Sequence, residues 1–141
     1  MTRELERLAG LAAELAPPEA LSHNDLGFTL ATSAADLDFF ASGGASSTIY
    51  CRARVGALGE AECPAAFAEA ALMGNFFWRA TEGATLSWNE TENAIYLTDR
   101  FDEGAMADAK ALANYADGFL RTLHDWRARL QSYLEGKEVS K

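Results

Sequence analysis

Residues 72–101, LMGNFFWRATEGATLSWNETENAIYLTDRF, constrain the fold more than any other part of the chain. They leave the end of an apolar helical run and enter two short segments in which apolar and polar residues alternate. Such alternation predicts half-buried β-strands, and the polar NETEN sequence between them predicts a hairpin turn. A chain that passes from a helix into a hairpin and then into a long amphipathic segment favours an α+β fold.

Apolar residues at helical spacing predict three helices, at residues 1–16, 64–77 and 104–134. Pro17 and Pro18 end the first helix because proline cannot continue it. Pro64 is a favoured first helical residue and opens the second. Asp102 is a predicted cap for the third helix, and Gly136 ends it.

Alternating patterns predict five strands, at residues 26–31, 36–41, 49–55, 84–89 and 95–98. Residues 33–35 form a tight connection, the small SGGASS residues at 42–47 form a turn, and residues 56–62 form a loop. The predicted order is helix, three strands, helix, two strands, helix, with a five-stranded antiparallel sheet. With 141 residues, residues 1–141 are expected to form a single domain.

The second predicted helix is apolar on nearly every side. It carries two apolar stripes, one of Ala66, Ala70, Met73 and Phe77 and one of Phe67, Ala71, Gly74 and Trp78. Only Glu69 and Asn75 interrupt the apolar surface of this helix. A small sheet covers only one side of such a helix. The apolar residues on its other side therefore indicate that a second subunit packs there.

The charge of the chain limits its partners and its location. The formal net charge is -9 and the isoelectric point is about 4.6, which disfavours binding to phosphate backbones. No apolar run approaches the ~20 residues of a membrane-spanning helix. The N-terminus carries charged residues in place of a signal sequence, so a cytoplasmic protein without membrane insertion is expected.

No motif in the chain indicates catalysis, a cofactor or a metal. His23 and His124 lie outside any HExxH pattern, and Cys51 and Cys63 are far apart with no CxxC. Neither a nucleophile elbow nor a glycine-rich phosphate loop occurs. The expectation is a protein that is not an enzyme, with no cofactor and no metal, whose cysteines stay reduced.

Apolar and aromatic side chains exceed what a small core requires. Phe40, Tyr50 and Tyr96 are predicted to point away from the apolar side of their strands. The first helix presents a broad stripe of Leu5, Leu8, Leu11 and Leu15. Exposed aromatic residues mark partner sites in many proteins, so these residues are candidates for binding another protein.

The order of the elements and the spacing of Asn75, Thr81, Gly83 and Leu86 carry a family resemblance. By these features the chain resembles the type III secretion chaperone family, in its class I of effector chaperones. The resemblance covers nearly the whole chain and is most specific at residues 72–97. It implies a binding protein that holds the N-terminal region of a secreted effector as an extended segment, uses no nucleotide, and dimerises through the middle helix.

Pattern and resemblance together assign two sets of residues. The predicted effector contacts are Leu5, Leu8, Leu11, Leu15, Phe40, Tyr50 and Tyr96. The predicted homodimer contacts are Phe67, Ala70, Met73, Gly74 and Phe77. The chain departs from the family pattern at Phe76, Phe77 and Trp78, where members often have small residues or leucine. The alternative is a small α+β regulatory or ligand-binding domain on the same fold that has no secretion cargo.

Overall fold

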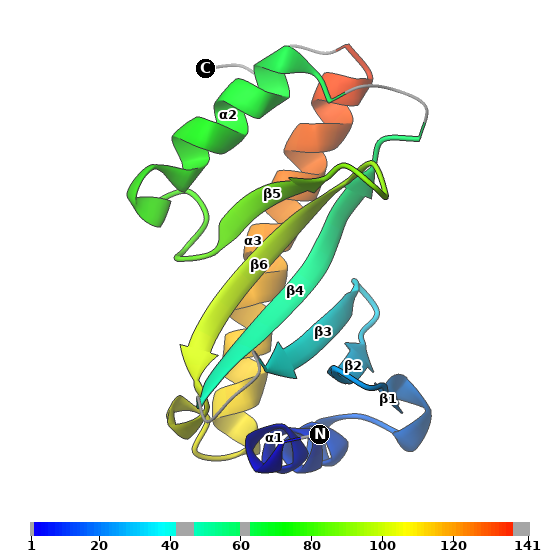
Figure 1. Ribbon diagram of the computed structural model, residues 1–141, viewed down its shortest axis with the longest axis vertical. Coiled ribbons are helices and arrows are strands. Elements are labelled where there is room, and N and C mark those ends of the chain that lie inside the picture. The colour runs from blue at the N-terminus through cyan, green and yellow to red at the C-terminus, as the bar shows by residue number, and fades with distance from the viewer. Residues whose placement is uncertain (1, 42–46, 60–62, 137–141) are drawn as a thin grey trace. The chain divides into compact units, whose positions relative to one another are not determined.

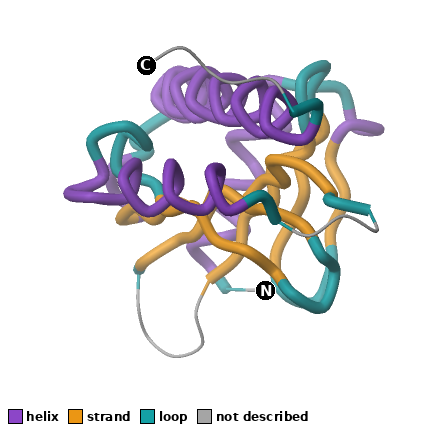
Figure 2. The backbone as a smooth tube through the Cα atoms, turned by 90° about the horizontal axis from the view of Figure 1, so that it is seen from above, coloured by secondary structure: helices purple, strands orange, loops and turns teal. Residues whose placement is uncertain are grey.

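The structure is a computed structural model that describes residues 2–41, 47–59 and 63–136 (Figure 1). Figure 2 shows its helices in purple and its strands in orange. The helices are α1 (Arg3–Leu15), α2 (Ala65–Asn75) and α3 (Ala109–Leu134), with short 3-10 turns η1 (Pro18–Ala20), η2 (Phe76–Trp78) and η3 (Glu103–Ala105). The strands are β1 (Leu21–His23), β2 (Gly27–Ala31), β3 (Asp36–Ala41), β4 (Thr48–Ala57), β5 (Thr85–Asn89) and β6 (Ala94–Asp102). This combination confirms the predicted α+β class.

The strands form one antiparallel sheet in the order β1-β2-β3-β4-β6-β5. The prediction of five strands is wrong by one, because β1 adds a sixth strand at the edge. It pairs with β2 through Leu21↔Leu30 and His23↔Phe28. Three residues are too few to show an alternating pattern, so only pairing with β2 defines this strand.

The predicted helix ends shift where local hydrogen bonds decide them. Asp102 does cap a helical turn, but its side chain accepts a hydrogen bond from the Gly104 N–H at the start of η3. The long helix α3 begins five residues later than predicted, where Asp108 accepts a hydrogen bond from the Ala111 N–H at 2.8 Å. Gly136 follows the last turn with φ +73°, as its predicted role requires.

Two other predicted boundaries also move. The middle helix ends at Asn75, and the 3-10 turn η2 follows it in place of a continued α-helix. Strand β4 continues to Ala57, so the loop predicted from residue 56 begins later. Most of the predicted SGGASS turn, residues 42–46, lies outside the described residues.

The described chain divides into two compact units. The first, the N-terminal unit, comprises Met1–Ala53 and Asp99–Gly118. Within it α1 packs on β1, β2 and β3. The rings of Phe28 and Phe39 stack with centroids 5.0 Å apart and are almost completely buried. Arg7 ties α1 to η3 by donating to the carbonyl oxygens of Glu103 and Met106 at 2.8 and 2.6 Å.

The second, the hairpin unit, comprises Arg54–Thr98 and Phe119–Lys141. Within it α2 contacts β5, and Figure 1 shows the two elements side by side. Trp126 is the largest fully buried side chain and meets Phe67 edge to face with centroids 6.1 Å apart. Its Nε1 donates to the Ala80 carbonyl oxygen at 3.0 Å, so the buried indole has a partner for its polar atom.

Among residues 2–41, 47–59 and 63–136, no helix combines the length and the apolar character that crossing a membrane requires.

Candidate functional site

Helix α2 buries only one narrow side. Phe67 and Gly74 face the interior, and Gly74 lies so close to Trp126 that an added Cβ would meet its Cζ2 atom at 2.6 Å. Leu72 and Met73 on the other side are 72% and 76% exposed. Two large apolar side chains at this exposure leave an unpaired apolar surface on the helix.

Three consecutive aromatic residues, Phe76, Phe77 and Trp78, extend that surface and are here named the aromatic cluster. Their side chains are 67%, 70% and 51% exposed. The rings of Phe76 and Phe77 meet edge to face at 4.6 Å, and Trp78 Nε1 donates to the Thr85 hydroxyl oxygen at 3.1 Å. The cluster is therefore ordered by its own contacts although it faces outward.

The backbone of the aromatic cluster is strained. Phe77 and Trp78 have φ of +51° and +54°, the left-handed region that bulky residues rarely occupy. Each such residue costs about 1–2 kcal/mol relative to the right-handed conformation. Strain of this kind at exposed aromatic residues is typical of functional sites, where a second interaction offsets it.

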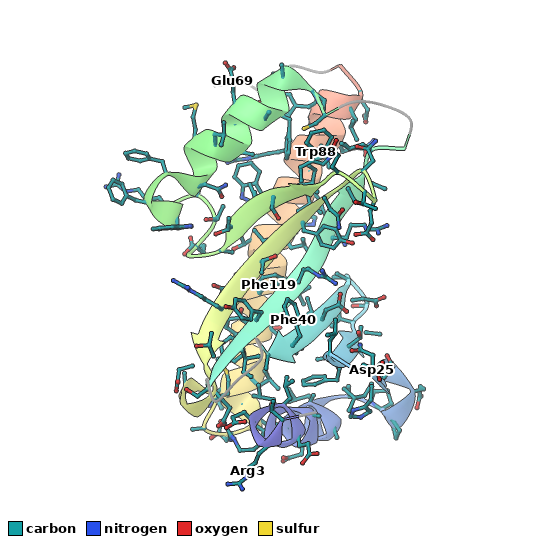
Figure 3. All side chains as sticks on the ribbon, in the orientation of Figure 1. Arg3, Asp25, Phe40, Glu69, Trp88 and Phe119 are labelled. Atoms are coloured by element: carbon teal, nitrogen blue, oxygen red, sulfur yellow. The ribbon has the colours of Figure 1, made fainter. Side chains whose placement is uncertain are left out.

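A pocket of about 560 Å³ opens between helix α2 and strand β5 and is here named the α2–β5 pocket. It is lined by Cys63, Phe67, Ala68, Ala71, Leu72, Leu86, Ser87, Trp88 and Ile95. Trp88 is 51% exposed at the rim of this pocket, and Figure 3 labels it near the end of β5. The lining is mostly apolar, which suits an apolar group.

Asn75 closes the edge of β5 beside this pocket. Its Nδ2 donates to the Leu86 carbonyl oxygen at 3.1 Å, and its Oδ1 accepts from the Leu86 N–H at 2.9 Å. In an antiparallel pair, alternate residues turn their backbone groups away from the neighbouring strand. The amide of Asn75 occupies this outward-facing position, where an added strand would otherwise bind.

The predicted dimer residues divide into two groups. Met73 and Phe77 lie on the exposed surface, and Ala70 is half-buried. Phe67 and Gly74 lie in the core of the hairpin unit, because Trp126 and Tyr133 pack on the Phe67 ring and Trp126 packs on Gly74. Helical spacing alone does not show which stripe of an all-apolar helix meets its own chain.

The N-terminal unit carries a second aromatic surface, on the polar side of β3 and β4. The rings of Phe40 and Tyr50 stack with centroids 5.4 Å apart, as cross-strand partners in register. The Arg52 guanidinium lies over the Phe40 ring at 5.5 Å and contacts the Asp38 carboxylate at 3.5 Å. Figure 3 labels Phe40, which belongs to β3. Phe40 and Tyr50 are half-buried, and their ring planes lie nearly parallel, at 16° to each other.

Three of the predicted effector contacts are buried in the single chain. Leu5 and Leu8 are 1% and 0% exposed, because the α1 stripe that they define covers the strands. Tyr96 is 8% exposed: its hydroxyl donates a hydrogen bond to Glu92 Oε2 at 2.7 Å, and the Arg54 guanidinium lies over its ring. The remaining α1 residues, Leu11 and Leu15, are half-buried and 41% exposed.

Several surface residues lay outside the predicted sets. Leu72, Trp88 and Leu26 are large, apolar and more than half exposed, and none was assigned to a partner surface. Trp88 was expected on the apolar side of its strand, because it alternates with polar residues in the sequence. Trp88 shares its face of β5 with the buried Leu86 but lies at the rim of the α2–β5 pocket, where it stays 51% exposed.

One buried cluster of titratable groups lies in the N-terminal unit. Tyr115 donates to Asp99 Oδ2 at 2.8 Å, and burial together with the neighbouring Cys51 and Asp99 raises the pKa of Tyr115 far above its usual value. Burial, with the Asp99 charge, raises the pKa of the Cys51 thiol well above its ordinary range. Both groups are neutral at physiological pH, which is the behaviour of packed core residues.

The described residues hold no group of three or more His, Cys, Asp or Glu side chains placed to bind a metal ion. Asp36 is exposed, and Asp38 accepts from the Thr29 hydroxyl at 2.7 Å.

The solved structures that share this fold include three complexes. A chain of the ExsC–ExsE complex aligns with a TM-score of 0.69 at 14% identity, covering 89% of this chain and 95% of that chain. The Yersinia pestis type III secretion chaperone SycH, in complex with a stable fragment of YscM2, aligns at 0.62 with 16% identity, covering 90% and 98%. The heterodimeric ExoU–SpcU complex of the Pseudomonas aeruginosa type III secretion system aligns at 0.57 with 16% identity, covering 87% and 93%.

No curated protein matches the sequence significantly. The model of the Tir chaperone protein (CesT) family matches residues 41–127, which is more than half of the chain. The matched region contains β4, α2, β5 and β6, together with most of α3. It therefore includes Asn75 and Leu86, which carried the resemblance in the sequence. The chain belongs to the Tir chaperone protein (CesT) family.

Proposed function

We propose that the protein is a bacterial type III secretion chaperone. It binds the N-terminal region of a secreted effector in the cytoplasm, keeps that region soluble and secretion-competent, and presents it to the export apparatus. It acts as a homodimer joined through α2 and performs no catalysis. The observation that carries the proposal is the match to the Tir chaperone protein (CesT) family in a chain that leaves apolar side chains exposed on both of its units, among them Leu15 and Met73.

The similar structures support this reading because they are complexes. The ExsC–ExsE, SycH–YscM2 and ExoU–SpcU structures each pair two different proteins. A chaperone of this kind holds an unfolded segment by pockets for its apolar side chains and by hydrogen bonds to its main chain. The Phe40–Tyr50 stack offers a flat aromatic surface for such side chains, with Leu15 as a further exposed apolar contact.

The two uncovered surfaces take different partners in this proposal. The α2 surface of the hairpin unit is assigned to the second copy, through Met73, Phe77 and the half-buried Ala70. The N-terminal unit is assigned to the effector, through Leu11, Leu15, Phe40 and Tyr50. This division leaves each surface with one partner.

The test is to express the tagged chain in its native host and to identify co-purifying proteins by mass spectrometry and the complex mass by light scattering. The expected result is two copies of this chain with one secreted protein, and loss of that protein when its own N-terminal segment is deleted. A chain that purifies without a secreted protein under secretion-inducing conditions would contradict the chaperone function.

The α2–β5 pocket favours a second candidate, a ligand-binding or regulatory domain on the same fold. Its volume of about 560 Å³ lies within the range that accepts small organic molecules. This candidate predicts that a small apolar compound co-purifies with the protein and is released on denaturation. Native mass spectrometry separates the two candidates, because a bound compound and a bound protein differ greatly in mass.

A further inference from the structure

The connection between α2 and β5, residues 76–84, contains most of the strained backbone of the described chain. Figure 1 shows it as the loop that leaves α2 and returns to β5. Four non-glycine residues of the described chain have positive φ, and three of them, Phe77, Trp78 and Glu82, lie here. Thr81 is only 1% exposed, and its Oγ1 has no hydrogen-bond partner among the described residues. Strained backbone and unsatisfied buried groups persist only where surrounding contacts hold them in place.

The local sequence does not require α2 to end at Asn75. The helix breaks at Phe76, where ψ is +111°, yet residues 76–82 contain neither proline nor glycine. Gly83, at φ +92°, is the first residue after Asn75 of the type that ends helices. The present end of α2 is therefore decided by contacts and not by a helix-breaking residue.

Side-chain hydrogen bonds supply those contacts. Asn75 donates to the Leu86 carbonyl oxygen at 3.1 Å and accepts from the Leu86 N–H at 2.9 Å, and this pair of bonds is here named the latch. Trp78 Nε1 donates to the Thr85 hydroxyl oxygen at 3.1 Å. Both contacts join the end of α2 and the aromatic cluster to the start of β5, so they hold the connection in a short, strained path.

We propose that residues 76–79 are a conformational switch with two states. In the latched state, which the structure shows, α2 ends at Asn75 and the latch is closed. In the released state α2 continues through residues 76–79 and the latch is open. Each added helical residue carries the chain about 1.5 Å along the helix axis and leaves one residue fewer for the return to β5, so the longer helix separates Asn75 from Leu86. The Leu86 N–H and carbonyl oxygen then lie on the edge of β5 without the Asn75 amide.

The released state joins two groups of exposed apolar side chains into one face. Residues four apart on a helix lie on the same side, which places Phe76 beyond Leu72 and Phe77 beyond Met73. All four side chains are between 67% and 76% exposed in the latched state. A protein partner that covers this continuous face binds the released state more tightly and shifts the equilibrium towards it. Occupation of α2 thereby opens the edge of β5, and this coupling goes beyond the proposed function.

Opposing contributions of similar size keep the two states close in free energy. Release removes the positive φ of Phe77 and Trp78 and turns Trp78 towards the side of α2 that carries Gly74 and packs on Trp126. It costs the latch and, because the connection takes a new path, the hydrogen bond from Trp126 Nε1 to the Ala80 carbonyl oxygen at 3.0 Å. Two arrangements of one segment that differ by so little form a switch that a partner can bias.

Zinc binding to engineered histidine pairs measures the released fraction. Two histidines four residues apart bind Zn²⁺ together only where the chain between them is helical. Met73→His with Phe77→His spans the present end of α2, whereas Glu69→His with Met73→His lies inside α2 and is the matched control; all three positions are exposed. Because only the released fraction binds, isothermal titration should show the spanning pair binding Zn²⁺ at least about tenfold more weakly than the control pair, yet more tightly than Met73→His alone.

Opening the latch should strengthen that zinc site. Asn75→Ala, added to the spanning pair, is expected to tighten Zn²⁺ binding about tenfold, since the loss of two hydrogen bonds favours the released state. The same change added to the control pair should leave its affinity unchanged. A spanning pair no tighter than Met73→His alone, with or without Asn75→Ala, overturns the switch. A spanning pair as tight as the control pair while Asn75 is present also overturns it, because the latched state would then not be the resting state.

NMR relaxation dispersion tests the switch without a histidine pair. The Leu86 amide of the wild type is expected to show exchange between two states on the microsecond-to-millisecond timescale. Phe77→Gly adopts positive φ at little cost and disfavours a helix, so it should lower the released population about tenfold and suppress that exchange. A Leu86 amide without exchange in the wild type, or with the same exchange in Phe77→Gly, overturns the proposal. Circular dichroism confirms that each variant folds. None of these measurements requires a secreted protein or a second copy of the chain, so failure of the switch leaves the proposed function as it stands.

Discussion

Asn75 and Leu86 are joined by two hydrogen bonds, from Asn75 Nδ2 to the Leu86 carbonyl oxygen at 3.1 Å and from the Leu86 N–H to Asn75 Oδ1 at 2.9 Å. One side chain at the end of α2 thus occupies the position of a neighbouring strand on the edge of β5. This explains the asparagine in physical terms, because an amide alone supplies the donor and the acceptor that a backbone position requires. It also fixes the end of α2, and hence the start of the aromatic cluster, relative to the hairpin.

Replacing Asn75 should destabilise the protein measurably. Asn75→Ala leaves the Leu86 N–H and carbonyl without their partner, and we expect the free energy of unfolding to fall by about 1–3 kcal/mol. Asn75→Asp keeps the acceptor but loses the donor, so its free energy of unfolding should lie between those of the wild type and Asn75→Ala. Urea unfolding followed by circular dichroism measures both. An Asn75→Ala variant as stable as the wild type would contradict the bridging role.

Gly74→Ala should destabilise the hairpin unit although alanine is the better helix former. The new Cβ would lie 2.6 Å from the Trp126 ring, which is buried and held by its hydrogen bond to Ala80, so packing must shift at a cost of about 1–3 kcal/mol. The matched control is Gly10→Ala in α1, where nothing lies within 4 Å and the change should stabilise by about 0.5–1 kcal/mol. Thermal or urea unfolding measures both changes in the free energy of unfolding. Changes of opposite sign for the two variants confirm the prediction, and changes of the same sign contradict it.

Glu82→Gly should stabilise the turn before β5. Glu82 is exposed and has φ of +53°, a conformation that costs a side-chain-bearing residue about 1 kcal/mol and costs glycine almost nothing. Gly83→Ala at φ +92° is the reverse change in the same turn and should destabilise. The free energies of unfolding of the two variants relative to wild type provide the measurement. A Glu82→Gly variant that loses stability would show that the side chain contributes more than the backbone strain removes.

Stability should fall at alkaline pH partly through Cys51. Burial, with the Asp99 charge, raises the pKa of the Cys51 thiol in the folded protein, while in the unfolded chain the thiol ionises near its ordinary pKa of about 8.5. The stabilisation that this pKa difference gives the folded protein is fully present below the unfolded-state pKa. It is lost as the pH rises towards the thiol's pKa in the folded protein, at about 1.4 kcal/mol per pH unit.

Cys51→Ala removes this contribution. Although the variant should be less stable throughout, because the side chain is fully buried, its loss of unfolding free energy between pH 7.5 and 9.5 should be smaller than that of wild type by about 1.4 kcal/mol. Urea unfolding at the two pH values tests this, and the range stops below the usual pKa of tyrosine so that Tyr115 does not contribute. Equal pH dependence in both proteins would exclude Cys51 as the source.

Phe40→Ala and Tyr50→Ala should each weaken effector binding. Under the proposed function their stacked rings contact apolar side chains of the effector segment, and we expect each truncation to lower affinity about tenfold, or about 1.4 kcal/mol. Tyr96→Phe is the control, because Tyr96 is buried and its hydroxyl bonds to Glu92 within its own unit. Isothermal titration with the effector's N-terminal segment measures all three. Unchanged affinity for both ring truncations would remove this surface from the effector site.

Much of the fold was predictable because it follows local patterns. Alternation identified β2 to β6, and helical spacing with proline and glycine signals identified all three helices. The failures have local causes as well. Strand β1 is too short to show a pattern, and the start of α3 depended on whether Asp102 or Asp108 accepted the capping hydrogen bond.

The candidate binding residues were less predictable. Leu5, Leu8 and Tyr96 look the same in the sequence as Leu11, Leu15 and Tyr50, because periodicity marks a face of a helix or strand but not what covers it. The packing of α1 on the strands buried the first pair, and Glu92 and Arg54 covered Tyr96.

The sequence by itself determined the α+β class, the order of the main elements, the excess of apolar residues around residues 64–78 and the family resemblance at Asn75 and Leu86. These properties depend on residue types at short spacing, which the chain states directly. Only the tertiary structure decided which side of α2 meets Trp126, which side stays open beside the α2–β5 pocket, and that the aromatic cluster is held outward in a strained conformation. Those outcomes depend on contacts between residues far apart in the chain, and short-range patterns carry no record of such contacts.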